Sequence, residues 1–89
     1  MEEQQLLRVA RAIADPTRFG ILKKISESGE ICCGALAAVF PVKQATVSHH
    51  VKILEEAGLV ETRREGQHHY FRVVPATLAD YRATLAQIL

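Results

Sequence analysis

The stretch "TVSHHVKILEEAGLVETRREGQHHYFRV" constrains the fold of this chain most, because a helical apolar period runs directly into a hairpin pattern. Val47, Val51 and Leu54 recur at the spacing of one helical face, which predicts a helix packed on one side. Gly58 follows this period, where the left-handed conformation of a helix C-cap favours glycine. Two strand-like segments then flank "REGQ", with Gly66 at the turn position that requires a positive φ. A short helix is therefore expected to lead straight into a β-hairpin.

Two helices are predicted near the N-terminus. Apolar residues at helical spacing predict the first over residues 3–14. The second begins sharply, because Asp15 is suited to the N-cap and Pro16 to the first helical position, and Gly29 is placed to end it. The residues of the second helix expected to face the core are Phe19, Leu22 and Ile25.

The other elements follow from similar signals. An extended segment at residues 30–31 leads into a third helix over residues 33–40, which Pro41 stops, and the next helix begins near Gln44. After the hairpin, apolar positions predict a last helix over residues 76–89. The predicted fold is mainly α with a small β-hairpin, in the order α-α-β-α-α-β-β-α, which is the layout of a winged helix-turn-helix.

The chain length predicts a single domain over residues 1–89, and a domain of this size has a modest core. Apolar residues on the first and last helices exceed what one small core can cover, so we expect a homodimer. These residues are Leu6, Val9, Ile13, Leu78, Leu85 and Ile88.

Composition limits the class of protein and the partners. The chain is 48% hydrophobic and 24% charged, as in ordinary globular proteins, and no apolar run has the length of a membrane span. The beginning "MEEQQLLRVARAIADP" lacks the basic-then-apolar layout of a signal peptide, so a cytoplasmic location is expected. Because the net charge is only +1, any DNA-binding surface must be local.

Small or hydrogen-bonding side chains lie on the outward face of the helix that begins near Gln44, as entry into the DNA major groove requires. The Gln44 amide suits a bidentate pair with adenine, and Ser48 and His49 suit base edges or phosphates. Arg63 and Arg64, at the hairpin tip, are expected to contact sugar-phosphate or a minor groove. The predicted DNA-binding residues are Lys43, Gln44, Thr46, Ser48, His49, Lys52, Arg63 and Arg64.

Three motifs, "ADPTRFGIL", "TVSHHVKILEEAGLV" and "REGQHHYFRV", lie in register between Ala14 and Val73. Through them the chain resembles the ArsR/SmtB family of small bacterial metal- and stress-responsive repressors. The resemblance implies a homodimeric repressor that binds double-stranded DNA, with residues 3–14 and 76–89 forming the dimer interface. A two-fold dimer further predicts an inverted-repeat operator. One departure is Lys43, where the family often has a capping serine, because lysine cannot accept a hydrogen bond from the free amides.

Cys32 and Cys33, in "EICCGAL", occupy the place where arsenic-responsive relatives carry two cysteines separated by one residue, and Gly34 stands where the second would be. Cys32 is predicted at the N-cap of the third helix, where the helix dipole favours a thiolate. Two interpretations stay open. The cysteines are small buried hydrophobes, or they are a metal site that binds arsenite or another thiophilic inducer, or reacts with oxidants. No cofactor is expected to be required.

Other chemistry is not expected. The last helix contains Asp80 and no histidine, so the zinc site of many family members is absent there. His68 and His69 are neighbours on a strand and point to opposite faces. His49 and His50 have no orienting carboxylate, so the chain is not expected to be an enzyme. Two alternatives remain: a winged-helix module that binds only protein, which would leave the groove-facing side chains without a role, and a constitutive DNA-binding regulator without a sensor.

Overall fold

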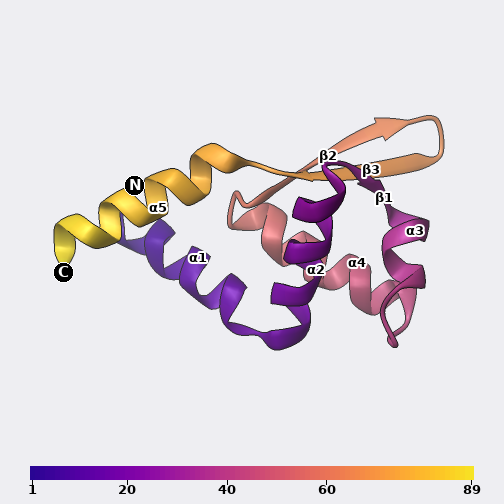
Figure 1. Ribbon diagram of the computed structural model, residues 1–89, viewed down its shortest axis with the longest axis horizontal. Coiled ribbons are helices and arrows are strands. Elements are labelled where there is room, and N and C mark those ends of the chain that lie inside the picture. Colours follow the sequence, from indigo (N-terminus) through magenta and orange to yellow (C-terminus); the bar gives the residue numbers. More distant parts are fainter.

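The computed structural model describes all residues, 1–89, and has the predicted order of elements (Figure 1). The elements are α1 (Glu3–Ala14), α2 (Pro16–Ser28), β1 (Ile31–Cys32), α3 (Cys33–Ala38), α4 (Gln44–Glu56), β2 (Val60–Glu65), β3 (His68–Val73) and α5 (Pro75–Ile88). Bounds differ from the prediction mainly at α3, which ends at Ala38 rather than Phe40. The residue before a proline is disfavoured in the helical conformation, so Phe40 cannot continue the helix into Pro41.

Local signals set the helix ends as predicted. The Asp15 carboxylate accepts a hydrogen bond from the Arg18 backbone N–H at 2.9 Å and so caps α2. Gly29 ends the same helix with a φ of 74°. Lys43 is the N-cap residue of α4 and makes no side-chain capping bond, and Cys32 at the start of α3 makes none either. The amides at the N-termini of α3 and α4 therefore lack a capping side chain.

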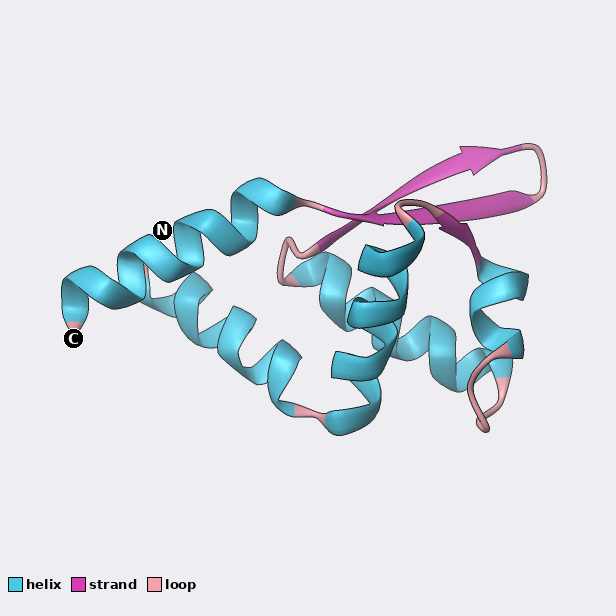
Figure 2. Ribbon diagram, viewed as in Figure 1, coloured by secondary structure: helices cyan, strands magenta, loops and turns pink.

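The sheet has three antiparallel strands in the order β1-β3-β2. Strands β2 and β3 form a hairpin that projects beyond the helices at the end of the molecule opposite the chain termini (Figure 2). Its turn contains Gly66, whose φ of 62° is a conformation that other residues rarely adopt. The hairpin is the wing of the predicted winged helix-turn-helix fold.

The core lies between α1, α2, α3, α4 and the inner face of the sheet. Thirteen buried residues form one cluster: Val9, Ala12, Ile21, Leu22, Ile25, Leu36, Val47, Val51, Leu54, Ala57, Leu59, Val60 and Phe71. Phe19 was predicted in the core and is 51% exposed, so that prediction is wrong. The buried face of α2 is centred on Ile21, Leu22 and Ile25, which places Phe19 roughly 110° away around the helix.

The terminal helices divide their apolar residues in a way that the sequence did not reveal. Leu6 and Val9 were expected at a dimer surface, but they are 6% and 0% exposed inside the protomer. Helix α1 packs against both α2 and α4. Leu6 and Val9 lie on the packed face of α1 and are therefore buried inside the protomer. None of the α5 residues is buried, and Leu7, Ile88 and Leu89 are exposed. Uncovered apolar surface therefore lies on α5 and the outer side of α1.

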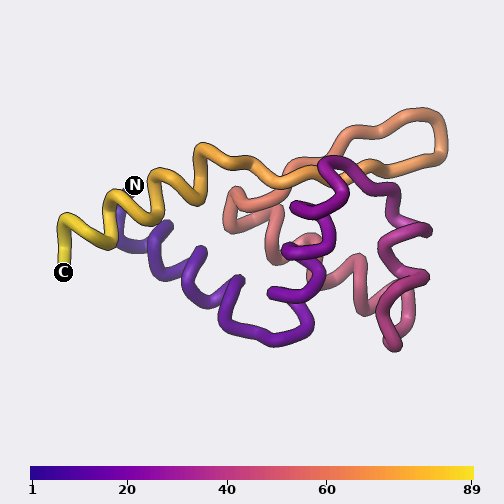
Figure 3. Tube along the Cα trace, viewed as in Figure 1, coloured from indigo at the N-terminus to yellow at the C-terminus, as the bar shows by residue number.

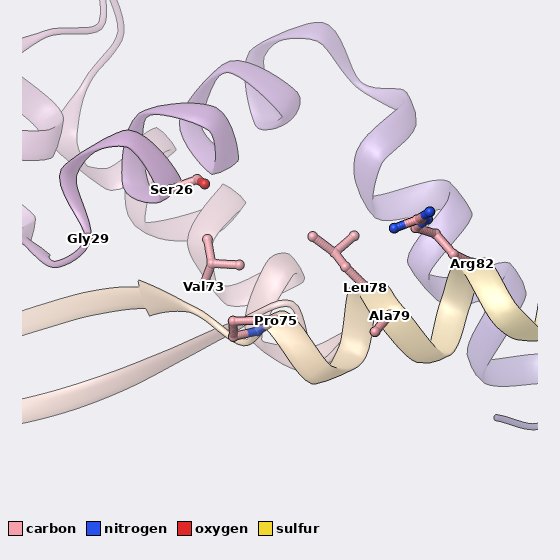
Figure 4. A pocket seen from close by; sticks show the side chains of 7 residues that line it. All are labelled: Ser26, Gly29, Val73, Pro75, Leu78, Ala79 and Arg82. Atoms are coloured by element: carbon pink, nitrogen blue, oxygen red, sulfur yellow. The ribbon is translucent and has the colours of Figure 1, made fainter.

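Helices α1 and α5 lie side by side at the end of the molecule away from the wing (Figure 3). The Met1 ammonium group donates to Asp80 Oδ1 and Thr84 Oγ1, both at 3.1 Å. A depression of about 530 Å³ lies where α2, β3 and α5 meet, and Val73 and Leu78 are among its lining residues (Figure 4). No helix in the structure combines the length and the apolar character needed to cross a membrane.

Candidate nucleic-acid interface

Helix α4 has one buried and one exposed face, as its periodicity predicts. Val47, Val51 and Leu54 are at most 1% exposed. The outward residues are all exposed and are concentrated near the N-terminus of the helix: Lys43, Gln44, Thr46, Ser48, His49 and Lys52. Small and amide side chains at the leading end allow the close approach to base edges that a major-groove helix requires.

The Cys33 thiol contacts two of the predicted base-contacting residues. Gln44 Nε2 donates a hydrogen bond to Cys33 Sγ at 3.7 Å, and Ser48 Oγ lies 3.8 Å from the same sulfur. A cavity of about 410 Å³ opens here and is lined by both cysteines, Gln44, Ser48 and wing residues 67–69. The tertiary fold thus brings the cysteines, α4 and the wing together, which their separation in the sequence did not predict.

Neither cysteine is fully buried, and both are free thiols. Cys33 is partly packed against the hydrophobic core, whereas Cys32 is paired with Tyr70 in the sheet. No three histidine, cysteine, aspartate or glutamate side chains are arranged to hold a metal ion. An ion bound by both cysteines would therefore need a further ligand from outside this chain.

Arg18 connects α4 to the first two helices, a role that the sequence analysis missed. Its Nε donates to the Ala12 carbonyl oxygen at 2.6 Å, and its Nη2 to the Arg11 carbonyl oxygen at 3.1 Å. Its Nη1 lies 3.3 Å from His50 Nδ1 on α4. Because Arg18 satisfies carbonyl groups at the end of α1, it fixes the junction of α1 and α2 against α4. The motif "ADPTRFGIL" contains this arginine, but nothing in its local pattern indicates the distant partner.

The two wing arginines have different surroundings. Arg63 Nη2 lies 2.7 Å from Glu30 Oε1, and its Nη1 lies 2.5 Å from Glu65 Oε2. Its guanidinium carbon also lies 4.6 Å from the centroid of the Tyr70 ring. The hydrogen bond from Arg63 lowers the pKa of the Glu30 carboxyl, and the hydrogen bond to Glu30 raises the pKa of Arg63.

Arg64 lies on the other face of the hairpin, because successive strand residues alternate. In register it is opposite His69, and His69 lines a cleft together with Ser48 and Lys52 of α4. No ion pair involves Arg64. Its cationic side chain therefore belongs to the side of the wing that faces the exposed residues of α4.

An exposed polar helix supported by α3, followed by a projecting hairpin with a cation on the same side, defines a winged helix-turn-helix DNA-binding domain. The family model described as a helix-turn-helix domain matches residues 13–63. The arsenical resistance operon repressor of Staphylococcus aureus is 35% identical over 80 residues, which cover 90% of this chain and 76% of that protein. The transcriptional repressor SdpR of Bacillus subtilis is 35% identical over 81% of this chain and 79% of that protein.

Solved structures agree with these relatives. An ArsR-like transcriptional regulator from a Rhodococcus species is similar with a TM-score of 0.87 and 29% identity, over 96% of this chain and 79% of that chain. The homodimeric winged helix-turn-helix DNA-binding domain of a Mycobacterium bovis protein has a TM-score of 0.77 and 31% identity, over 96% of this chain and 77% of that chain. The chain belongs to the ArsR family of winged helix-turn-helix transcriptional regulators. It is a regulator and not an enzyme.

Proposed function

We propose that this chain is a homodimeric repressor that binds an inverted-repeat operator in double-stranded DNA and is released by an inducer. The observation that carries this proposal is the exposed polar N-terminal half of α4, followed by Lys52. His69 of the wing lines a cleft with Ser48 and Lys52, and Arg64 is opposite His69 in the hairpin register. Two relatives bear the name of a repressor, which supports the same direction of regulation.

The polar residues in the N-terminal half of α4 and the cations near them have roles that follow from their chemistry. Gln44, Thr46, Ser48 and His49 contact base edges in the major groove, where hydrogen-bonding side chains distinguish base pairs. The cationic residues on the same side, which are Lys43, Lys52 and Arg64, contact phosphates. Phosphate contacts supply affinity for any sequence, whereas base contacts supply specificity.

Substitution of Ser48 or His49 by alanine tests these roles. An operator is first selected from a random-sequence library with the native protein. We expect Ser48→Ala or His49→Ala to weaken operator binding by about 1–3 kcal/mol per lost base contact and to leave random duplex binding unchanged. Ser28→Ala, at an exposed serine on α2, is the matched control.

Arg64→Ala is expected to weaken binding to all duplexes by a similar factor. If Ser48→Ala, His49→Ala and Arg64→Ala all leave operator affinity intact, the face assigned to DNA is wrong. If the native protein selects no operator and binds no duplex, the alternative of a protein-binding winged-helix module replaces this proposal.

The inducer proposed here is thiophilic or oxidising and acts at Cys32 and Cys33. Arsenite would form one arsenic–sulfur bond to each cysteine. Each bond replaces an arsenic–hydroxyl bond, and the hydroxyl group leaves as water with the thiol proton. The third arsenic ligand is the remaining hydroxyl group or a small thiol that replaces it in the same way. Cys33 already contacts Gln44 and Ser48, so arsenic bound to this sulfur disturbs the DNA-contacting residues directly. The proposal also places the protein in the cytoplasm, where thiols stay reduced.

The inducer is tested by measuring operator affinity with and without arsenite or peroxide. We expect either reagent to weaken DNA binding by the native protein, and Cys32→Ser and Cys33→Ser to reduce the response. A Ser26→Ala variant, which keeps both thiols, is expected to respond like the native protein. If neither reagent changes native affinity, the second candidate function, a constitutive DNA-binding regulator, is the better description.

A further inference from the structure

The guanidinium group of Arg63 forms two ion pairs, more than any other cation in the structure. Besides its ion pairs to Glu30 at 2.7 Å and Glu65 at 2.5 Å, it donates from Nε to the second oxygen of Glu30 at 3.4 Å. Its guanidinium group also lies over the Tyr70 ring, which adds a cation–π contact. An isolated exposed ion pair is weak and screened by salt. Several partners around one planar group hold it in a single orientation.

Arg63, Glu65 and Tyr70 lie on one face of the hairpin, and Arg64 and His69 lie on the other. Alternation along the strands puts Glu61, Arg63 and Glu65 on one face of β2, and Arg64 on the other. On the first face, Arg72 of β3 is paired with Glu61. This face therefore holds its cations next to carboxylates, which repel the DNA backbone, while Arg64 lies on the side of α4.

We propose that Arg63 is a positioning residue of the wing, held away from DNA by Glu30 and Glu65, and that Arg64 alone supplies the phosphate contact of the wing. This inference rests on the proposed DNA-binding function and changes the role of one residue expected from the sequence to contact DNA. The two arginines are adjacent and chemically identical, and they differ only in the strand face on which they lie.

The same contacts connect the wing to the segment that contains the cysteines. Glu30 immediately precedes β1, in which Cys32 is paired with Tyr70 of β3. Tyr70 is in turn opposite Arg63 in the hairpin. Arg63 thus connects the wing to the segment before β1, on the face of the hairpin away from Arg64.

The first test compares Arg63→Met with Arg64→Met, which remove the charge and keep an unbranched apolar stem. The measurement is the slope of the logarithm of affinity for a random-sequence duplex against the logarithm of salt concentration. One lost phosphate contact lowers the magnitude of this slope by about 0.9. In Arg64→Met we expect the slope to fall by this amount for each protomer that binds DNA. In Arg63→Met we expect the slope to be unchanged. Equal decreases in the two variants would overturn the proposal, because Arg63 would then contact phosphate.

The second test releases Arg63 by the double substitution Glu30→Gln and Glu65→Gln. We expect a steeper salt slope than in the native protein, because the freed guanidinium becomes available to phosphate. Glu61→Gln removes a carboxylate from the same face and frees Arg72 instead of Arg63. It should produce a smaller change, and it shows what the release of a different cation contributes. Adding Arg63→Met to the double variant should remove the gain. A gain that survives this addition would overturn the proposal, because it would come from general charge.

Circular dichroism melting establishes that each variant is folded. If Arg63→Met does not fold, the double variant decides: a steeper slope than in Glu61→Gln supports the proposal, and an unchanged slope overturns it. If the native protein binds no duplex, both the proposed function and this inference fail. If the native protein binds duplex with a salt dependence that Arg63→Met reduces as much as Arg64→Met does, only this inference fails.

Discussion

At the scale of single residues, hydrogen bonds between distant segments decide what each side chain does. Ser48 and Gln44 carry groups suited to base edges, yet in the free protein both contact the Cys33 sulfur. A thiol is a weak hydrogen-bonding partner, so DNA bases can replace it at little cost. In the proposed induction, this contact would carry a change at the sulfur to the two residues proposed to contact DNA, without movement of a whole helix.

Asp15 is expected to make stability depend on pH at the start of α2. The backbone hydrogen bond from Arg18 lowers the pKa of the Asp15 carboxyl. The ionised carboxylate therefore stabilises the folded protein above about pH 4, the ordinary range for aspartate, and this stabilisation is lost as pH falls through the lowered pKa. Asp15→Asn keeps a capping oxygen without the charge, and Asp15→Ala removes both.

The measurement is urea unfolding at pH 7 and at about pH 3, below the ordinary aspartate range. We expect Asp15→Ala to be less stable than the native protein at pH 7. Asp15→Asn should lose less stability than the native protein between the two pH values. If the native protein and Asp15→Asn decline equally with pH, the carboxylate does not have the assigned role.

At the scale of elements, α4 combines a weak start with a functional surface. Lys43 at its N-cap offers no oxygen to the free amides, and no side-chain capping bond forms. The same lysine is proposed to contact phosphate. The N-cap position of α4 thus holds a cation proposed to contact phosphate in place of a residue that would cap the helix.

We expect Lys43→Ser to stabilise the protein by about 1 kcal/mol, because serine at an N-cap accepts a hydrogen bond from a free amide. Lys43→Ala removes the same charge without adding a cap. Both variants should bind DNA more weakly with a shallower salt slope, and only Lys43→Ser should gain stability in chemical unfolding. Equal stability of the two variants would show that the N-terminus of α4 is already satisfied by water or by its neighbours.

At the scale of the whole molecule, α5 lacks a packing partner over much of its surface. The wing and α4 lie at one end, and α1 and α5 at the other (Figure 1). Two copies joined through α1 and α5 would bury the exposed apolar residues and place two α4 helices symmetrically, as successive half-sites about 10 base pairs apart require. The similar Mycobacterium bovis domain is homodimeric, which supports dimerisation as such.

Ile88→Asp is expected to convert the proposed dimer into a folded monomer. Ile88 is 54% exposed in the protomer, and Val39, on the far side of the fold, is also 54% exposed. Val39→Asp is therefore the matched control and should remain a dimer. Light scattering at micromolar concentration gives the oligomeric state, and circular dichroism checks the fold. A native protein that is monomeric, or an Ile88→Asp variant that stays dimeric, would contradict the proposed interface.

Much of the fold could be predicted from the sequence because its signals are local. Asp15 and Gly29 bound α2, Pro41 limits α3, and the apolar period of α4 meets the hairpin at Gly58. Each of these residues acts through its own backbone conformation or through partners a few positions away. The exposed face of α4 followed for the same reason, since a helical period defines both faces once one is buried.

Which residues meet across the fold was decided only by the tertiary structure. Helical spacing on α1 and α2 showed apolar faces but not their partners, so Phe19 was wrongly placed inside and Leu6 and Val9 outside. The different surroundings of Arg63 and Arg64 depend on Glu30, which lies far away along the chain and is brought close by the pairing of β1 with β3. Periodicity specifies the direction of a side chain relative to its own element, and only packing specifies what lies in that direction.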